Sequence, residues 1–261
     1  MTDHTQPTAA LPGGGAMPLL GFGTWQIHGD AAHRAVLDAL EAGYRHIDTA
    51  TMYGNESEVG RALRDSGVPR DEVFVTTKLP PDRAGQAPAT LDASLEALGL
   101  DAVDLWLIHW PPRRNPVALW EQFVAARDAG RVRSIGVSNF GAGEIDELST
   151  ATGETPAVNQ IRFGPSLYDP KLIAEHRERG VVVEGYSPFK TTNLRNPVLT
   201  RIATAHGVDP ARVVLRWHIQ HEIVVIPKSK TPERIAGNAA VGGFELTPDE
   251  MSAIDGLGSG R

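Results

Sequence analysis

Three side chains that can carry charge or exchange protons follow short apolar runs at a regular interval in this sequence. Asp48 follows RHI, Lys78 follows VFVTT, and His109 follows VDLWLI. About 30 residues separate each from the next, the length of one strand plus one helix. Tyr53 lies in the loop after Asp48. If the runs are neighbouring parallel strands, the four side chains meet at the carboxyl end of one sheet.

These four side chains together could deliver a proton to a carbonyl oxygen. A free tyrosine has a pKa near 10, but an ammonium within about 4–6 Å favours the phenolate and lowers that pKa. We expect Lys78 to supply the charge, with Asp48 holding it in place, and His109 to orient the carbonyl. Taken singly, the aspartate, lysine and histidine are better explained as a helix-cap partner, a solvated strand end and a buried histidine. Their shared placement favours reduction of an aldehyde or ketone.

Reduction needs a hydride, which no side chain supplies, so a cofactor is expected. The later strand ends carry suitable groups. Amides and hydroxyls that could bind a carboxamide are found at Ser138, Asn139 and Gln160, and Tyr186 offers an aromatic face to a flat ring. No HExxH motif or paired metal-ligand spacing is present, so no metal site is expected.

A basic cluster follows the last apolar run, in a chain with a net charge of -7. It comprises Lys228, Ser229, Lys230 and, at the start of a helix, Arg234. Helix N-termini with Lys, Ser and Arg suit a phosphomonoester such as the 2′-phosphate of NADP. A solvated run of charges is the alternative.

The elements that must position these residues alternate between strands and helices. Apolar runs predict strands over 19–25, 45–48, 73–78, 103–109, 132–137, 157–161, 181–186 and 223–226. Helical spacing lies between them, with two helices before the eighth strand and two after it. Near-continuous Val, Ile and Leu strands indicate a parallel sheet covered by helices. A closed (β/α)8 TIM barrel is expected, with an open doubly wound sheet as the alternative, although no GxGxxG turn supports the latter.

Composition narrows the class of protein. The chain has 261 residues, 22% of them charged, and no cysteine, which excludes disulfides and a thiol nucleophile. An acidic balance disfavours a nucleic-acid partner, and no signal sequence or membrane span is found, so a cytoplasmic enzyme is expected. We expect residues 1–16 to form a flexible leader and residues 17–261 a single barrel domain that is a monomer.

From Met17 to about Leu257 the sequence resembles the aldo-keto reductase superfamily, in particular its short prokaryotic members of the 2,5-diketo-D-gluconate reductase type. The resemblance rests on eight motifs in order: GFGTWQ (21–26), GYRHIDTATMYGNE (43–56), TTKL (76–79), DLWLIHWP (104–111), GRVRSIGVSNF (130–140), VNQ (158–160), GYSP (185–188) and IPKS (226–229).

This resemblance implies a carbonyl reductase that uses NADPH/NADP+ on a (β/α)8 barrel. It implies Tyr53 as general acid, tuned by Asp48 and Lys78, and His109 as the group that orients the carbonyl. The implied cofactor contacts are Gly23, Thr24, Trp25, Ser138, Asn139, Gln160, Tyr186, Ser187, Lys228, Ser229, Arg234 and Asn238. The implied substrate contacts are Trp25, Tyr53, His109 and Trp110.

The sequence departs from the family pattern at two places. After Gln160 the family usually has an acidic residue, an aromatic, His and Pro, whereas this chain has Arg162, Phe163 and Gly164 before Pro165. Gly237 stands where an acidic contact to adenine is common. Short segments after Lys78 and after Leu257 predict an open, weakly selective pocket.

Two other functions fit parts of the pattern. One is a noncatalytic barrel that binds nicotinamide cofactor as a sensor or scaffold, which retention of all four proton-transfer residues disfavours. The other is a Schiff-base aldolase that uses Lys78, since barrel lysines can do that chemistry. The basic cluster at 228–234 has no role in an aldolase.

Overall fold

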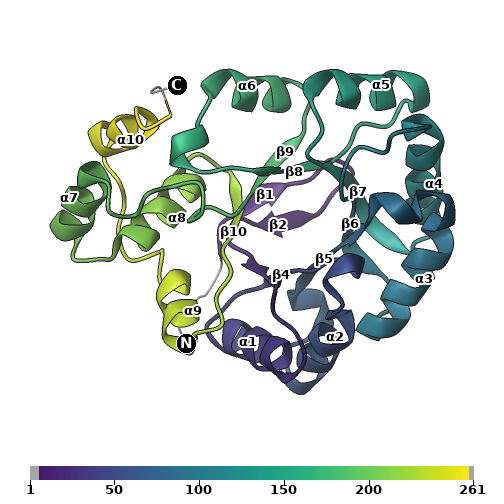
Figure 1. Cartoon of the computed structure of the whole chain (residues 1–261), viewed down its shortest axis with the longest axis horizontal. Helices are drawn as coiled ribbons and strands as arrows, with labels where there is room; N and C mark the ends of the chain where they lie inside the picture. Colours follow the sequence, from purple (N-terminus) through teal and green to yellow (C-terminus); the bar gives the residue numbers. More distant parts are fainter. Residues whose placement is uncertain (1–5, 259–261) are drawn as a thin grey trace.

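A computed structural model describes residues 6–258 and shows an eight-stranded parallel sheet rolled into a barrel and surrounded by helices (Figure 1). The strands are β3 (Phe22–Gly23), β4 (His46–Asp48), β5 (Phe74–Leu79), β6 (Val103–Ile108), β7 (Val132–Ser138), β8 (Val158–Arg162), β9 (Val182–Tyr186) and β10 (Val224–Ile226). Each strand pairs with the next in chain order. The predicted (β/α)8 barrel is confirmed.

Helices follow the strands and cover the outside of the sheet. They are α1 (Asp30–Glu41), α2 (Glu56–Asp65), α3 (Ala87–Leu98), α4 (Pro116–Asp128), α5 (Ala142–Thr152), α6 (Pro170–Glu178), α7 (Pro197–His206), α8 (Pro210–Gln220), α9 (Pro232–Ala239) and α10 (Pro248–Asp255). Glycines in the left-handed region follow the ends of α2, α3 and α4, with φ of 69° at Gly67, 67° at Gly99 and 72° at Gly130. None of the helices within residues 6–258 is both long and apolar enough to cross a membrane.

The barrel closes where the first and last strands meet. Leu20 bridges Val225 in parallel, and the amide of Gly21 donates to the carbonyl of Val225 at 2.9 Å. The first strand was expected over 19–25, but its regular part is only β3, because the chain around it pairs through isolated bonds to Val225 and Pro227. Side chains at 21 and 23 are absent for a steric reason, since a Cβ on Gly23 would lie 3.1 Å from the carbonyl oxygen of Ile226.

The segment expected to be a flexible leader contains an ordered hairpin. Strands β1 (Thr8–Ala10) and β2 (Ala16–Pro18) pair antiparallel, and Leu11 and Met17 are buried in the core. Gly13, Gly14 and Gly15 have φ of 85°, 92° and 124°, and these three glycines build the turn of the hairpin. Residues 1–5 of that expected leader, and 259–261 of the expected domain, lie outside the described residues.

Helix α2 begins three residues after Tyr53 and packs closely on the end of α3. This packing holds the start of α2, and with it the segment that carries Tyr53. A Cβ on Gly60 would overlap the backbone carbonyl of Leu98, whereas one on Gly143 in α5 would meet no atom of the described residues within 4 Å. We therefore expect Gly60→Ala to lower the free energy of unfolding by about 1–3 kcal/mol through overpacking.

Gly143→Ala is the matched helical control, and we expect it to raise stability by up to about 1 kcal/mol. Urea unfolding followed by circular dichroism measures both changes. Equal effects of the two substitutions would contradict the close α2–α3 approach.

Candidate active site

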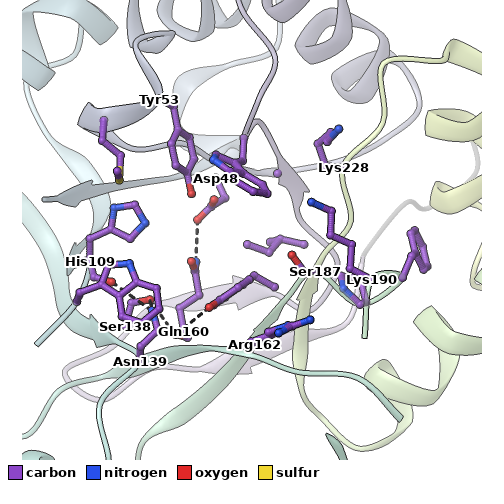
Figure 2. A pocket seen from close by; sticks show the side chains of 18 residues that line it. Asp48, Tyr53, His109, Ser138, Asn139, Gln160, Arg162, Ser187, Lys190 and Lys228 are labelled. Carbon is purple, nitrogen blue, oxygen red and sulfur yellow. Dashed lines mark hydrogen bonds between the residues drawn. The ribbon is translucent and has the colours of Figure 1, made fainter. Parts of the chain in front are cut away.

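The carboxyl ends of the strands surround one open cavity of about 510 Å³ (Figure 2). Twelve of the residues singled out from the sequence line it: Gly23, Trp25, Asp48, Tyr53, His109, Trp110, Ser138, Asn139, Gln160, Tyr186, Ser187 and Lys228. The strand-end spacing therefore brought together residues that lie up to 205 positions apart in the sequence.

Beneath the cavity lies a buried ion pair. The ammonium of Lys78 on β5 donates to both carboxylate oxygens of Asp48 on β4 at 2.7 Å, and to the carbonyl of Thr49 at 2.8 Å. Burial alone would lower the pKa of Lys78, but the charge of Asp48 and the hydrogen bonds to it raise that pKa above its usual value. Lys78 is therefore a fixed positive charge at neutral pH.

Tyr53 ends the short 3-10 turn η1 (Thr51–Tyr53), which places its ring above this pair. The ammonium of Lys78 lies 5.1 Å from the ring centroid. Burial raises the pKa of Tyr53, and the charge of Lys78 opposes this without cancelling it. The net direction is opposite to the lowering that the sequence suggested. Tyr53 consequently keeps its proton at neutral pH.

The rings of His109 and Tyr53 lie next to each other in an edge-to-face arrangement, with their centroids 5.7 Å apart. Burial, together with the charge of Lys78, lowers the pKa of His109 to about 3. The imidazole is neutral at physiological pH and keeps one N–H that can donate a hydrogen bond. Trp25 and Trp110 are exposed at the mouth of the same cavity.

A second wall of the cavity is an arc of hydrogen-bonded polar groups. The hydroxyl of Tyr186 donates to Oδ1 of Asn139 at 2.9 Å, and Nδ2 of Asn139 donates to Oγ of Ser138 at 2.9 Å. Asn139 adopts a φ of 63°, a left-handed conformation that asparagine tolerates. These bonds fix the Tyr186 ring at the edge of the cavity.

Gln160 was expected to bind a carboxamide, but its side-chain amide is hydrogen-bonded within the protein. Its Nε2 donates to Oδ2 of Asp48 at 2.8 Å, as Figure 2 shows, so in this structure it extends the buried network under the cavity. It still lines the cavity beside Ser138 and Asn139.

Five of the singled-out residues do not line the cavity. Lys78 is 0% exposed beneath Asp48, and Thr24 is buried with its hydroxyl donating to the carbonyl of Asp48 at 2.9 Å. Of the other three, Ser229 lies between β10 and α9, and Arg234 and Asn238 lie on α9. Ser229 directly follows Lys228, which lines the cavity.

Sequence reasoning missed several residues that line the cavity. They are Met52, Arg162, Pro188, Phe189, Lys190 and Ile226. The ammonium of Lys190 lies 4.4 Å from the centroid of the Trp25 ring, which joins the loop after β9 to the loop after β3. Arg162 had been noticed only as a departure from a family pattern, and its position two residues after Gln160 on one strand was the available signal.

A buried acid under the network was also missed. Glu184 on β9 is fully buried, and neither of its carboxylate oxygens has a hydrogen-bond partner among the described residues. The nearest basic atom in an ion-pair position is Nε2 of His46, 3.7 Å away. Burial, together with the charge of nearby Asp48, raises the pKa of Glu184 to about 8. Burial, reinforced by Lys78, lowers the pKa of His46 to about 3, so both groups are neutral at pH 7.

The residues that depart from the family pattern differ in how closely the neighbouring atoms pack around them. A Cβ on Gly164 would overlap the hydroxyl of Thr191, and Phe163 is buried with its ring stacked on Trp217 at 5.9 Å. Thr191 in turn donates to the carbonyls of Phe163 and Pro188, at 3.2 and 3.1 Å. A Cβ on Gly237 would meet no atom within 4 Å in the part of the chain that the structure describes, so no steric demand there explains the glycine.

A (β/α)8 barrel with a buried Asp–Lys pair, a tyrosine and a histidine around one open cavity has the architecture of a barrel enzyme. The sequence matches the model of the Aldo/keto reductase family over residues 19–259, and the chain belongs to this family.

Named relatives cover nearly the whole chain. An aldo-keto reductase from Mycolicibacterium vanbaalenii is 48% identical, covering 97% of this chain and 93% of the relative. The 2,5-diketo-D-gluconic acid reductase B of a Corynebacterium species is 45% identical, covering 98% and 94%. The crystal structure of a Bombyx mori aldo-keto reductase in complex with NADP superposes with a TM-score of 0.91 at 34% identity, covering 98% of this chain and 94% of that one.

The raised pKa of Glu184 predicts a pH dependence of stability. Between about pH 4.5 and pH 8 the unfolded chain has released this proton while the folded chain retains it. The free energy of unfolding therefore falls as pH rises through that window, by on the order of 1 kcal/mol per pH unit. Glu184→Gln should remove this component, so the variant gains stability relative to wild type between pH 5 and pH 8.

Urea unfolding at pH 5, 6.5 and 8 tests this expectation, with Glu233→Gln on the exposed face of α9 as the matched control. A stability difference between Glu184→Gln and wild type that stays constant with pH would show that Glu184 is ionised in the folded protein.

Proposed function

We propose that the protein reduces small aldehydes and ketones to alcohols with NADPH, and that Tyr53 is the general acid. One observation carries the proposal: a tyrosine that keeps its proton at neutral pH lies beside a fixed lysine charge in an open cavity. The cofactor is the one named for the Bombyx mori relative and for a yeast relative, glycerol 2-dehydrogenase (NADP(+)), which is 39% identical.

The side chains around the cavity fit such a cofactor. Tyr186 presents a ring that its bond to Asn139 holds in place, as a stacking surface for nicotinamide requires. Ser138 and Asn139 supply hydroxyl and amide groups for a carboxamide. At the other side of the cavity Lys228 leads into α9, where Ser229 and Arg234 would hold the 2′-phosphate. When bound, NADPH supplies the hydride.

Side chains of the protein would transfer the proton to the carbonyl oxygen. The Tyr53 hydroxyl gives its proton to the carbonyl oxygen as that oxygen becomes an alkoxide, and the phenolate left behind is stabilised by the ammonium of Lys78. Asp48 keeps that ammonium in position through two hydrogen bonds. Neutral His109 donates its N–H to the same carbonyl oxygen, and solvent entering through the open mouth returns the proton to Tyr53.

The structure disfavours the Schiff-base alternative. An aldolase lysine must be neutral and reach its substrate, whereas Lys78 is fully buried, makes three hydrogen bonds and has a raised pKa. The substrate would instead contact the exposed rings of Trp25 and Trp110 and the side chain of Met52.

We further propose that the protein acts in the cytoplasm as a monomer.

Replacing the proposed acid tests the role of Tyr53. We expect Tyr53→Phe to lower kcat for NADPH-dependent reduction of a simple aldehyde by about 10²–10⁴-fold, because the proton donor is lost. The dissociation constant for NADPH, measured by fluorescence titration, should change little. Wild-type turnover in the variant would refute the role of Tyr53, and an inactive wild type that still binds NADPH would favour the noncatalytic sensor or scaffold.

Cofactor choice tests the basic cluster. We expect wild type to bind NADPH more tightly than NADH, and Arg234→Ala to weaken NADPH binding by about tenfold while leaving NADH binding unchanged, because one charged hydrogen bond to the 2′-phosphate is lost. Arg201→Ala, at an exposed position on α7, is the matched control. Equal affinity of wild type for the two cofactors would contradict this assignment.

A further inference from the structure

Arg162 is the last residue of β8 and one of the residues that line the cavity. Side chains alternate along a strand, so Arg162 shares the inward face with Gln160, about 7 Å further toward the mouth. Gln160 bonds to Asp48 at the cavity floor. Arg162 therefore lies one layer higher, in the wall that a bound substrate would contact. Figure 2 shows it across the cavity from Tyr53, on the side of Ser187.

The charge of Arg162 has no counterpart in this wall. The cavity is lined by the cations Arg162, Lys190 and Lys228, and within residues 6–258 its only lining carboxylate is Asp48, which Lys78 already neutralises. Some arginines elsewhere on the protein form ion pairs, as Arg127 does with Glu154 at 2.7 Å and Arg179 does with Asp146 at 2.7 Å, and Arg162 forms none among the described residues. A cavity with an excess of positive charge in a chain of net charge -7 favours an anionic ligand.

The other two cations of the wall have different positions. Lys228 adjoins Ser229 and α9, where the proposed 2′-phosphate site lies. The ammonium of Lys190 is held over the Trp25 ring at 4.4 Å. Arg162 has neither arrangement, and its planar guanidinium can donate two parallel hydrogen bonds to one carboxylate.

We propose that Arg162 binds the carboxylate of the carbonyl substrate, so that the cavity prefers carbonyl acids over neutral aldehydes and ketones. This inference rests on the proposed reductase function and names its substrate class. The carboxylate bonds to the guanidinium while the carbonyl carbon of the same molecule lies near Tyr53 and His109. An aldehyde or keto group separated from a carboxylate by a short flexible chain meets both ends of this arrangement.

A matched pair of substrates tests the proposal. Succinic semialdehyde carries a carboxylate, and methyl 4-oxobutanoate is its neutral ester. We expect wild type to have the higher kcat/KM for the acid. Arg162→Met should lower kcat/KM for the acid by about 10–100-fold and for the ester by less than about threefold, since one charged contact is lost. Arg162→Lys should recover part of the loss, and Arg201→Met on α7 should change neither substrate.

Each alternative gives a different result. If the guanidinium binds the diphosphate of the cofactor instead, Arg162→Met raises the dissociation constant for NADPH and lowers the rates for both substrates equally, which overturns the inference. Equal kcat/KM for acid and ester in wild type, or no selective loss in Arg162→Met, overturns it too. If wild type reduces neither aldehyde with NADPH, the proposed function itself fails, and the inference fails with it.

Discussion

The ion pair between Asp48 and Lys78 is the interaction on which the site depends. Two opposite charges removed from water are tolerated only with close geometry and further hydrogen bonds, and loss of one partner typically costs about 3–5 kcal/mol. Here the carboxylate also accepts from Gln160, and the ammonium also donates to Thr49. The pair therefore locks strands β4, β5 and β8 at their carboxyl ends, and it supplies the fixed charge beside Tyr53.

Much of the fold and of the site could be predicted from the sequence because strand ends are marked by a change from apolar to polar residues. Asp48, Lys78 and His109 each follow such a change, and barrel geometry then places them at one level. The cavity wall from Phe189 and Lys190 could not be predicted, since the path of a loop is set by tertiary contacts such as that of Lys190 with Trp25. The ordered hairpin at 8–18 was not predicted, because glycines such as those in its turn are also typical of flexible segments.

The protonation states of buried groups could not be predicted from the sequence either. The sequence places a lysine near Tyr53 and predicts a lowered pKa, but the sign depends on how much water the fold removes from the phenol. In the folded chain burial outweighs the lysine charge. Glu184 gives a second example, because nothing in the run VVVEGY indicates that its carboxyl group is buried with no hydrogen-bond partner within residues 6–258.

The contact between Gly164 and Thr191 links two segments that follow different strands. Thr191 holds the loop of Lys190 through carbonyls on both segments, and its hydroxyl occupies the space of any side chain at 164. Substitutions at these two positions are therefore not independent. A histidine at 164 would have to displace the Thr191 hydroxyl, and its Cβ would also lie 2.9 Å from the Thr192 hydroxyl and 3.1 Å from the carbonyl oxygen of Pro188, so a side chain at this position requires the loop after β9 to change with it.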